Sequence, residues 1–298
     1  MKQSHAVLVL AAIGIFWGAS VPMSKFILNA GHAPIGILAW ENLLIAITLF
    51  LYKKVRREPI PLHGRAIRFY VLVGLLGTLL PGFCSYTAIS QLPAGIMSII
   101  FASVPMFSLS IALIAGLERF AMIRVVGVLL GMGAIVLLIG PSTSLPDPAK
   151  VAFVFVGLLA PFFYGFEGNY IDARKPEDVD AINALLGGSV LVTVVAGSIA
   201  WRGGDLIDIT QPWTAPLWVL FFVSLIHAFA YAGFIWLIGK TGAVFASQVS
   251  YIVTMTGVVA SLIYLGESYS LYVWTALVLM LGGLALVQPR KAVEPAPH

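Results

Sequence analysis

The chain has 298 residues, of which 60% are hydrophobic and only 10% are charged, and its formal net charge is +4. A soluble domain carries about 25% charged residues and about 45–50% apolar ones, and it needs polar groups to cover its surface. The composition therefore excludes an ordinary soluble protein and predicts an all-α integral membrane protein.

Ten apolar stretches are long enough to cross a bilayer. A helix that spans the hydrocarbon needs about 20 apolar residues, and only helices and closed barrels satisfy their backbone hydrogen bonds in lipid. The alternation typical of barrel strands is not visible, so all ten stretches are predicted to be helices. They cover approximately residues 6–28, 35–52, 67–90, 94–117, 122–140, 150–171, 181–200, 214–238, 243–265 and 270–288.

The first stretch follows Lys2 and is longer than the apolar core of a signal peptide, so we interpret it as the first span. Cys84 is the one cysteine, and no disulfide can form within the chain. P-loop, HExxH and GxSxG patterns do not occur, and the five histidines are scattered. The sequence argues against an enzyme, and it predicts neither a cofactor nor a metal site.

The basic residues predict the orientation. If the start of the chain is cytoplasmic, all 17 Lys and Arg residues fall on the cytoplasmic side except Lys25, Lys150 and Arg202. Such a bias follows the positive-inside rule, so it explains the net charge without a nucleic-acid partner. We predict that both ends are cytoplasmic, that the basic loop 53–68 faces anionic lipid or cytosol, and that residues 291–298 form a disordered tail.

One phrase occurs twice, as "LIAGLERF" (113–120) and "LIYLGESY" (262–269). A shift of 149 residues superposes the following pairs: Ala94 on Ala243, Ser98 on Ser247, and Glu118 on Glu267. Because each half has five spans, the halves enter the membrane in opposite directions, as in many secondary transporters. We predict two inverted five-helix repeats, 1–141 and 142–290. The alternative is that any two Leu- and Gly-rich spans resemble each other.

The two repeated segments also carry a family resemblance. "GLERFAMIRVVGVLLGMGAIVLLI" (116–139) and "LGESYSLYVWTALVLMLGGLALV" (265–287) resemble the paired signatures of EamA-type carriers of the drug/metabolite transporter superfamily, and "IFWGASVPMSK" (15–25) resembles their first-helix opening. The resemblance implies a ten-helix carrier in a bacterial inner membrane. Within that family, the aromatic lining and length are most similar to the YddG-type exporters of aromatic amino acids.

One segment departs from the family pattern. Members often carry an arginine in the second helix, where "AWENLLIA" (39–46) has Glu41 and Asn42. A carboxylate in place of a guanidinium changes which charged group of a substrate the site prefers. The departure argues against nucleotide-sugar and phosphorylated substrates.

Ionisable residues within spans are costly and usually face a cavity or a partner. Glu41 could line a cavity or pair with a neighbour such as Lys25. Glu167 could do the same or be an interfacial carboxylate that reaches water. His227 could be a hydrogen-bonded core histidine or a proton site, because its unperturbed pKa lies near neutrality.

Aromatic and polar side chains recur at helical spacing on several spans. Such stripes can be packing surfaces, but together they predict a mid-membrane cavity with aromatic walls and few polar anchors. Pro105 interrupts the fourth span beside Ser103 and is a candidate hinge or a static kink. The predicted cavity residues are Trp17, Ser20, Met23, Glu41, Tyr86, Phe101, Ser103, Phe163, Tyr164, Glu167, His227, Tyr231, Gln248 and Tyr251.

Two transport functions follow from these features. The first is a secondary exporter of small amphipathic metabolites, mainly aromatic or neutral amino acids, which works by alternating access with weak or no proton coupling. The alternative is a proton-coupled multidrug exporter of lipophilic organic cations, with Glu41 as the exchanging group. Receptors usually carry larger soluble loops, so the sequence also argues against a receptor.

Glycines in the fifth and tenth spans permit close packing. These two helices are therefore predicted to be scaffold or dimer helices in a monomer or weak homodimer.

Overall fold

A computed structural model describes residues 3–140, 147–210 and 212–287. Within these ranges the chain forms helices and connecting turns, without a strand. The α-helices and the short π-helix η1 and 3-10 helix η2 are, in chain order, α1 (Gln3–Asn29), α2 (Pro34–Arg56), α3 (Gly64–Gly74), η1 (Leu75–Leu79), α4 (Leu80–Gln91), α5 (Ala94–Phe101), α6 (Val104–Ile114), α7 (Met122–Ile139), η2 (Pro148–Lys150), α8 (Val151–Arg174), α9 (Ala181–Gly203), α10 (Ala215–Thr241), α11 (Ala243–Ala246), α12 (Val249–Leu265) and α13 (Leu271–Val287).

The predicted ten-helix membrane fold is confirmed. Among the described residues, eight helical segments have the length and hydropathy of membrane spans, and α12 and α13 are shorter apolar helices. Large apolar side chains cover the outside of the bundle, including Leu129, Val136 and Phe155. This surface suits lipid, because the helices satisfy their own backbone groups. The repeat boundary at 141–142 and the predicted tail 291–298 lie outside the described residues.

Three of the ten spans are not regular helices. The third is one continuous rod in which the π-helical turn η1 joins α3 to α4, directly before Pro81. The fourth is broken at Ala102–Ser103, between α5 and α6, and the ninth is broken at Ser247–Gln248, between α11 and α12. A proline inside a helix usually produces a bend. The structure instead accommodates this proline with an i→i+5 turn.

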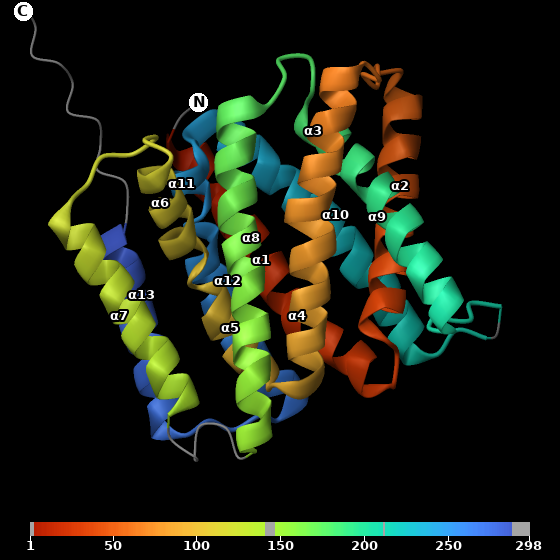
Figure 1. Ribbon diagram of the computed structural model, residues 1–298. Coiled ribbons are helices and arrows are strands. Elements are labelled where there is room, and N and C mark those ends of the chain that lie inside the picture. The colour runs from red at the N-terminus through yellow and green to blue at the C-terminus, as the bar shows by residue number, and fades with distance from the viewer. Residues whose placement is uncertain (1–2, 141–146, 211, 288–298) are drawn as a thin grey trace, which may run out of the picture.

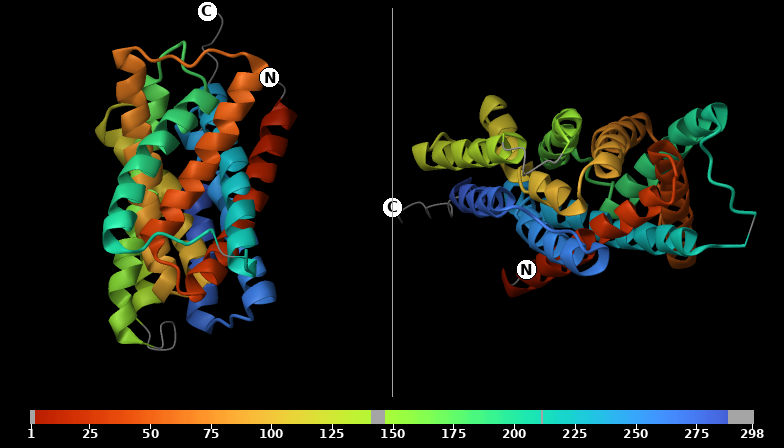
Figure 2. Two further views of the ribbon diagram at one scale, coloured as in Figure 1. Left: turned by 90° about the vertical axis from the view of Figure 1, so that its right-hand side faces the viewer. Right: turned by 90° about the horizontal axis from the view of Figure 1, so that it is seen from below.

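The helices form two rows, which the view from below in Figure 2 shows. Helix α1 packs against α10 and α12, and α8 packs against α4 and α6. Helices α2 and α9 pair at one side, and α7 and α13 pair at the other (Figure 1). If each of the first five spans is exchanged with its counterpart among the last five, the same pairs of spans are in contact. Such contacts are expected of two halves related by a two-fold axis.

Glycines of α7 and α13 let these two helices of the same chain pack closely against each other. A Cβ atom on Gly127 would lie 2.5 Å from the Gly283 carbonyl oxygen, and one on Gly283 would lie 2.5 Å from the Gly127 carbonyl oxygen. This close approach explains why both positions are glycine. The glycine face expected for close packing is therefore occupied by the contact between α7 and α13 within this chain.

Candidate substrate cavity

A cavity of about 110 Å³ lies between the two rows, at the middle of the helices. Its walls come from α1, α2, the third span, α5, α6, α8, α9, α10 and α12, so both halves of the chain contribute. Most of its wall is apolar. The lining residues are Trp17, Ser20, Val21, Ser24, Leu38, Glu41, Ile45, Gly77, Thr78, Gly82, Ser85, Tyr86, Ile89, Phe101, Val104, Tyr164, Leu185, His227, Tyr231, Phe234, Val249, Ser250 and Val253.

Glu41 is the polar centre of this cavity. Its Oε1 lies 2.6 Å from Nδ1 of His227, and its Oε2 accepts a hydrogen bond from the Tyr86 hydroxyl. The second ring nitrogen of His227, Nε2, lies 2.8 Å from the hydroxyl oxygen of Ser20. These contacts join α1, α2, α4 and α10. A buried carboxylate is stable when it is paired and hydrogen-bonded, and a proton between Nδ1 and Oε1 provides that pairing.

Aromatic rings form the wall beside this polar centre. The ring of Trp17 lies 6.3 Å from Tyr164, 6.1 Å from Tyr231 and 5.7 Å from Phe234, measured between centroids. Phe101 lies 6.4 Å from Tyr164. Such walls contact flat or apolar groups and the faces of the rings attract cations. The arrangement can hold an amphipathic molecule with its polar head at Glu41 and His227.

Glu167 lies behind the wall. The residue is 0% exposed, and its Oε1 accepts a hydrogen bond from the hydroxyl of Tyr231, which does line the cavity. The expectation that Glu167 could reach interfacial water is therefore wrong. The reason is the register of α8, which turns this position toward α10 and η1 instead of toward lipid or solvent.

The structure also corrects the proposed partner of Glu41. Lys25 donates to the backbone carbonyl oxygens of Ile89 at 2.8 Å and Ser90 at 3.1 Å. These two carbonyl groups belong to the last turn of α4, at the end of the third span. Glu41 thus pairs across the bundle with His227 and not with Lys25 of α1.

The predicted cavity residues divide into two groups. Those that line the cavity are Trp17, Ser20, Glu41, Tyr86, Phe101, Tyr164, His227 and Tyr231. The others surround it: Met23 and Tyr251 pack against the larger apolar core, Ser103 donates to the Ile100 carbonyl at the break in the fourth span, Phe163 contacts Phe162, Gln248 lies at the break in the ninth span, and Glu167 lies behind Tyr231.

Sequence reasoning missed several lining residues, among them Gly77, Thr78, Ser85 and Phe234. Gly77 and Thr78 belong to the π-helical turn, for which the segment "GLLGTLLPG" (74–82) held the only signal, its glycines before Pro81. Among the described residues there is no group of three or more His, Cys, Asp and Glu side chains placed to hold a metal ion.

Glu267 belongs to the loop between α12 and α13, and this loop lies at the lower end of the bundle in Figure 1. Its carboxylate accepts hydrogen bonds from the backbone N–H groups of Ala94 at 2.7 Å and Gly95 at 3.1 Å, and from the Tyr269 hydroxyl at 2.5 Å. The acid thereby caps the start of α5, where the helix dipole favours negative charge. Burial, and then the bond to Glu267, raise the pKa of the Tyr269 hydroxyl.

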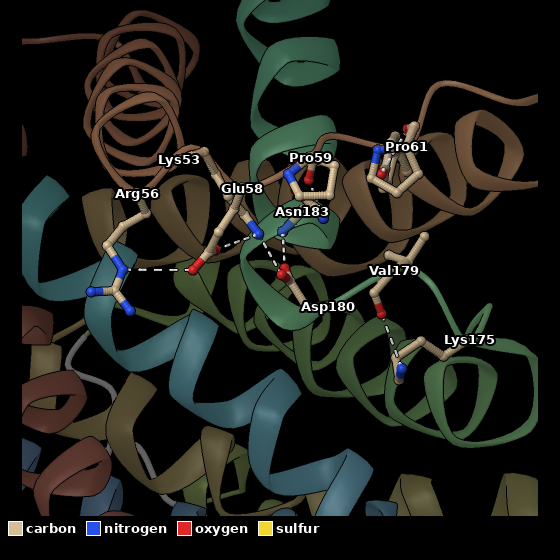
Figure 3. Close-up of polar contacts among 10 residues, drawn as sticks. Lys53, Arg56, Glu58, Pro59, Pro61, Lys175, Val179, Asp180 and Asn183 are labelled. Carbon is tan, nitrogen blue, oxygen red and sulfur yellow. Dashed lines mark hydrogen bonds and ion pairs between the residues drawn. The ribbon is translucent and has the colours of Figure 1, made fainter.

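The opposite end is held by a separate polar network, which Figure 3 shows. The buried ammonium group of Lys53 pairs with Asp180 and, at 3.0 Å, with Glu58. Asp180 also accepts from the Asn183 backbone N–H at 2.7 Å and so caps α9. Beside it, His63 Nε2 donates to Asp178 at 2.7 Å, and this bond lowers the pKa of the Asp178 carboxyl.

Comparison with known proteins places this architecture in a family. The model of the EamA-like transporter family matches residues 4–140 and, a second time, residues 151–288. An uncharacterized inner membrane transporter of Escherichia coli, YedA, is 24% identical over 96% of this chain and 92% of its own length. An uncharacterized transporter of Archaeoglobus fulgidus is 24% identical over 94% of this chain and 97% of its own.

Two further comparisons cover almost the whole chain. The uncharacterized transporter YvbV of Bacillus subtilis is 25% identical over 99% of this chain and 95% of its own length. A crystal structure described only as that of a protein superposes with a TM-score of 0.67 at 15% identity, and the match covers 96% of each chain. That likeness supports the fold alone. With the fold, the cavity and the two matches of the family model together, the chain belongs to the EamA-like transporter family.

Proposed function

We propose that this protein is a secondary exporter of small amphipathic metabolites, with aromatic or neutral amino acids as the preferred class. The observation that carries this proposal is the cavity itself, in which Trp17, Tyr164 and Tyr231 face a single polar centre at Glu41 and His227. The Glu41 carboxylate suits the ammonium group of an amino acid. The rings suit its side chain.

The two halves of the chain would expose this cavity alternately to the two sides of the membrane. The symmetric packing pattern and the double match of the family model support an inverted repeat, which is the usual basis of alternating access. We place the protein in a bacterial inner membrane with both ends cytoplasmic, because basic residues gather at one end of the bundle. Outward transport follows the resemblance to YddG-type exporters.

A second candidate function rests on one contact. Glu41 is a carboxylate that faces an aromatic cavity and lies 2.6 Å from a ring nitrogen of His227. A lipophilic organic cation could replace the proton held between these two groups, and the rings would contribute cation–π attraction. This would make the protein a proton-coupled exporter of organic cations.

Transport by the purified protein in proteoliposomes tests both candidates. We expect uptake of a radiolabelled neutral aromatic amino acid, with or without a pH gradient, and a reduction of about tenfold or more in Glu41→Gln, because removing one partner of a buried charged pair costs several kcal/mol. Glu177→Gln, a carboxyl group on an exposed loop, is the matched control and should transport normally.

The same vesicles decide between the candidates. If a lipophilic cation is transported only with a pH gradient, and only this transport is lost in Glu41→Gln, the organic-cation function is correct. If the wild-type protein moves neither substrate, the exporter proposal is wrong. A lack of any difference between Glu41→Gln and Glu177→Gln would remove Glu41 from the binding site.

A further inference from the structure

The carboxyl group of Glu167 is the most enclosed acidic group in the bundle. The residue is 0% exposed. Of the described residues, only Tyr231 donates a hydrogen bond to this carboxyl group, and the ion pairs of the described chain do not include it. It differs in this respect from Glu41, which has two partners of which one can carry a positive charge.

The space around Glu167 is built by an irregular turn. Gly77 lies in the π-helix η1, and a Cβ atom at that position would collide with the hydroxyl of Tyr231 and with the carboxyl group of Glu167. A π-helical turn is rare and often marks a functional site. Here it brings a glycine, at a place that has no room for a side chain, against the hydrogen bond between Tyr231 and Glu167.

The Tyr231 hydroxyl connects this carboxyl group to the substrate cavity. Tyr231, Gly77 and Thr78 all line the cavity, whereas Glu167 does not. Tyr231 is therefore part of the cavity wall, and its hydroxyl bonds to Glu167 behind that wall. A hydroxyl group both accepts and donates protons, so it can pass a proton between the cavity and Glu167.

Charged groups on the elements around α8 do not neutralise Glu167. Helices α5, α6 and α11 and the turn η1 carry no ionisable side chain. The His227 imidazole of α10 is bonded to Glu41. The remaining ionisable groups on the packed elements are Cys84 and Tyr86 of α4, Tyr231 and Lys240 of α10, Arg65, Arg68 and Tyr70 of α3, Tyr164, Tyr170, Asp172 and Arg174 of α8 itself, and Lys150 of η2.

None of those groups forms an ion pair with Glu167 among the contacts of the described residues. An isolated buried carboxylate is strongly disfavoured, and the group takes up a proton instead. The conformation described here is therefore one in which Glu167 is protonated. A change that let water or a cation reach it would release that proton.

We infer that Glu167 is a proton-binding site behind the substrate cavity, which exchanges one proton with the cavity through the Tyr231 hydroxyl and couples transport to pH. The inference rests on the proposed transport function. On release, the Tyr231 hydroxyl first turns its hydrogen from Glu167 Oε1 toward the cavity. The carboxyl O–H bond then breaks as the Tyr231 oxygen accepts that proton, the hydroxyl gives its own proton to a water molecule in the cavity, and a carboxylate remains. Uptake reverses these steps, so that one proton accompanies each cycle.

Infrared titration of the purified protein tests the site without any transport. We expect a carbonyl stretch of a protonated carboxylic acid at neutral pH that is present in the wild type and in Glu177→Gln but absent in Glu167→Gln. In Tyr231→Phe the band should remain and shift, because the carbonyl oxygen loses its donor. If Glu167→Gln leaves the protonated-carboxyl band unchanged at every pH, the inference is wrong.

Transport in proteoliposomes tests the coupling. With equal pH on both sides, Glu167→Gln should still exchange substrate, whereas accumulation driven by a pH gradient should be lost. Tyr231→Phe supplies a second variant if Glu167→Gln does not fold, and it should slow the pH-driven component at least tenfold. Retention of the full pH response in both variants, or a wild-type protein that exchanges substrate without any pH response, overturns the coupling while leaving the transport function intact.

Discussion

Two glutamates in the middle of this bundle differ only in their surroundings. Glu41 lines the cavity with Tyr86 and His227 as partners, and Glu167 lies one residue layer behind it with Tyr231 alone. In a medium of low polarity the partners decide whether a carboxyl group is charged. The first glutamate is thus suited to hold a substrate's positive head and the second to hold a proton.

The fit between Gly77, Tyr231 and Glu167 makes a prediction about a single residue. In Gly77→Ala the new methyl group would overlap the Tyr231 hydroxyl and the Glu167 carboxyl group, so that the packed site must rearrange. Overpacking of this kind costs about 1–3 kcal/mol. We expect a lower midpoint of thermal unfolding in detergent and a weakened response of transport to pH.

Gly133→Ala is the matched control. This glycine lies in α7, where a Cβ atom would have no neighbour within 4 Å. Alanine stabilises a helix by about 0.5–1 kcal/mol relative to glycine, so the midpoint should stay the same or rise slightly. Equal midpoints for Gly77→Ala and the wild type would contradict the close packing described at the π-helical turn.

At the level of elements, the sequence predicted where the spans lie but not where they break. The length of the apolar stretches was enough to locate all ten helices. The π-turn before Pro81 and the break at Ser247–Gln248 were not foreseen, because local sequence does not specify how neighbouring helices fill the space at such points. The pairing of Glu41 with His227 was missed for the same reason, since the two residues are 186 positions apart.

The break in the fourth span tests the hinge prediction for Pro105. This proline follows the interruption at Ala102–Ser103 and lacks the N–H group that would continue α5 into α6. In Pro105→Ala that donor is restored, and a straighter, stiffer span should result. We expect substrate exchange in proteoliposomes to slow at saturation about tenfold or more, with little change in the apparent affinity.

Pro161→Ala provides the comparison for this prediction. Pro161 lies inside the unbroken helix α8, so its replacement removes a proline without affecting a break. Its exchange rate should stay close to that of the wild type. If the two variants slow exchange equally, or if Pro105→Ala has no effect, Pro105 is a static kink and not a hinge.

At the scale of the whole molecule, polar contacts of different chemistry lie at the two ends of the bundle. Glu267 binds backbone N–H groups at one end, and Lys53 binds Asp180 and Glu58 at the other. The packing pattern is symmetric under exchange of the halves, but these polar contacts are not. The two halves therefore differ in their polar contacts although their helices pack in the same pattern.

The inverted repeat makes a prediction about membrane sidedness that the fold alone does not test. The loop after α1 and the loop after α8 follow corresponding spans of the two halves, so in an inverted repeat they lie on opposite faces of the membrane.

In a Cys84→Ser background, a membrane-impermeant thiol reagent should label Ala30→Cys in intact cells, because this exposed residue is predicted to be extracytoplasmic. It should label Glu177→Cys only after the membrane is permeabilised, because the basic end of the bundle is predicted to face the cytoplasm. Labelling of both residues in intact cells would exclude the inverted arrangement, and the reverse order would place both ends of the chain outside.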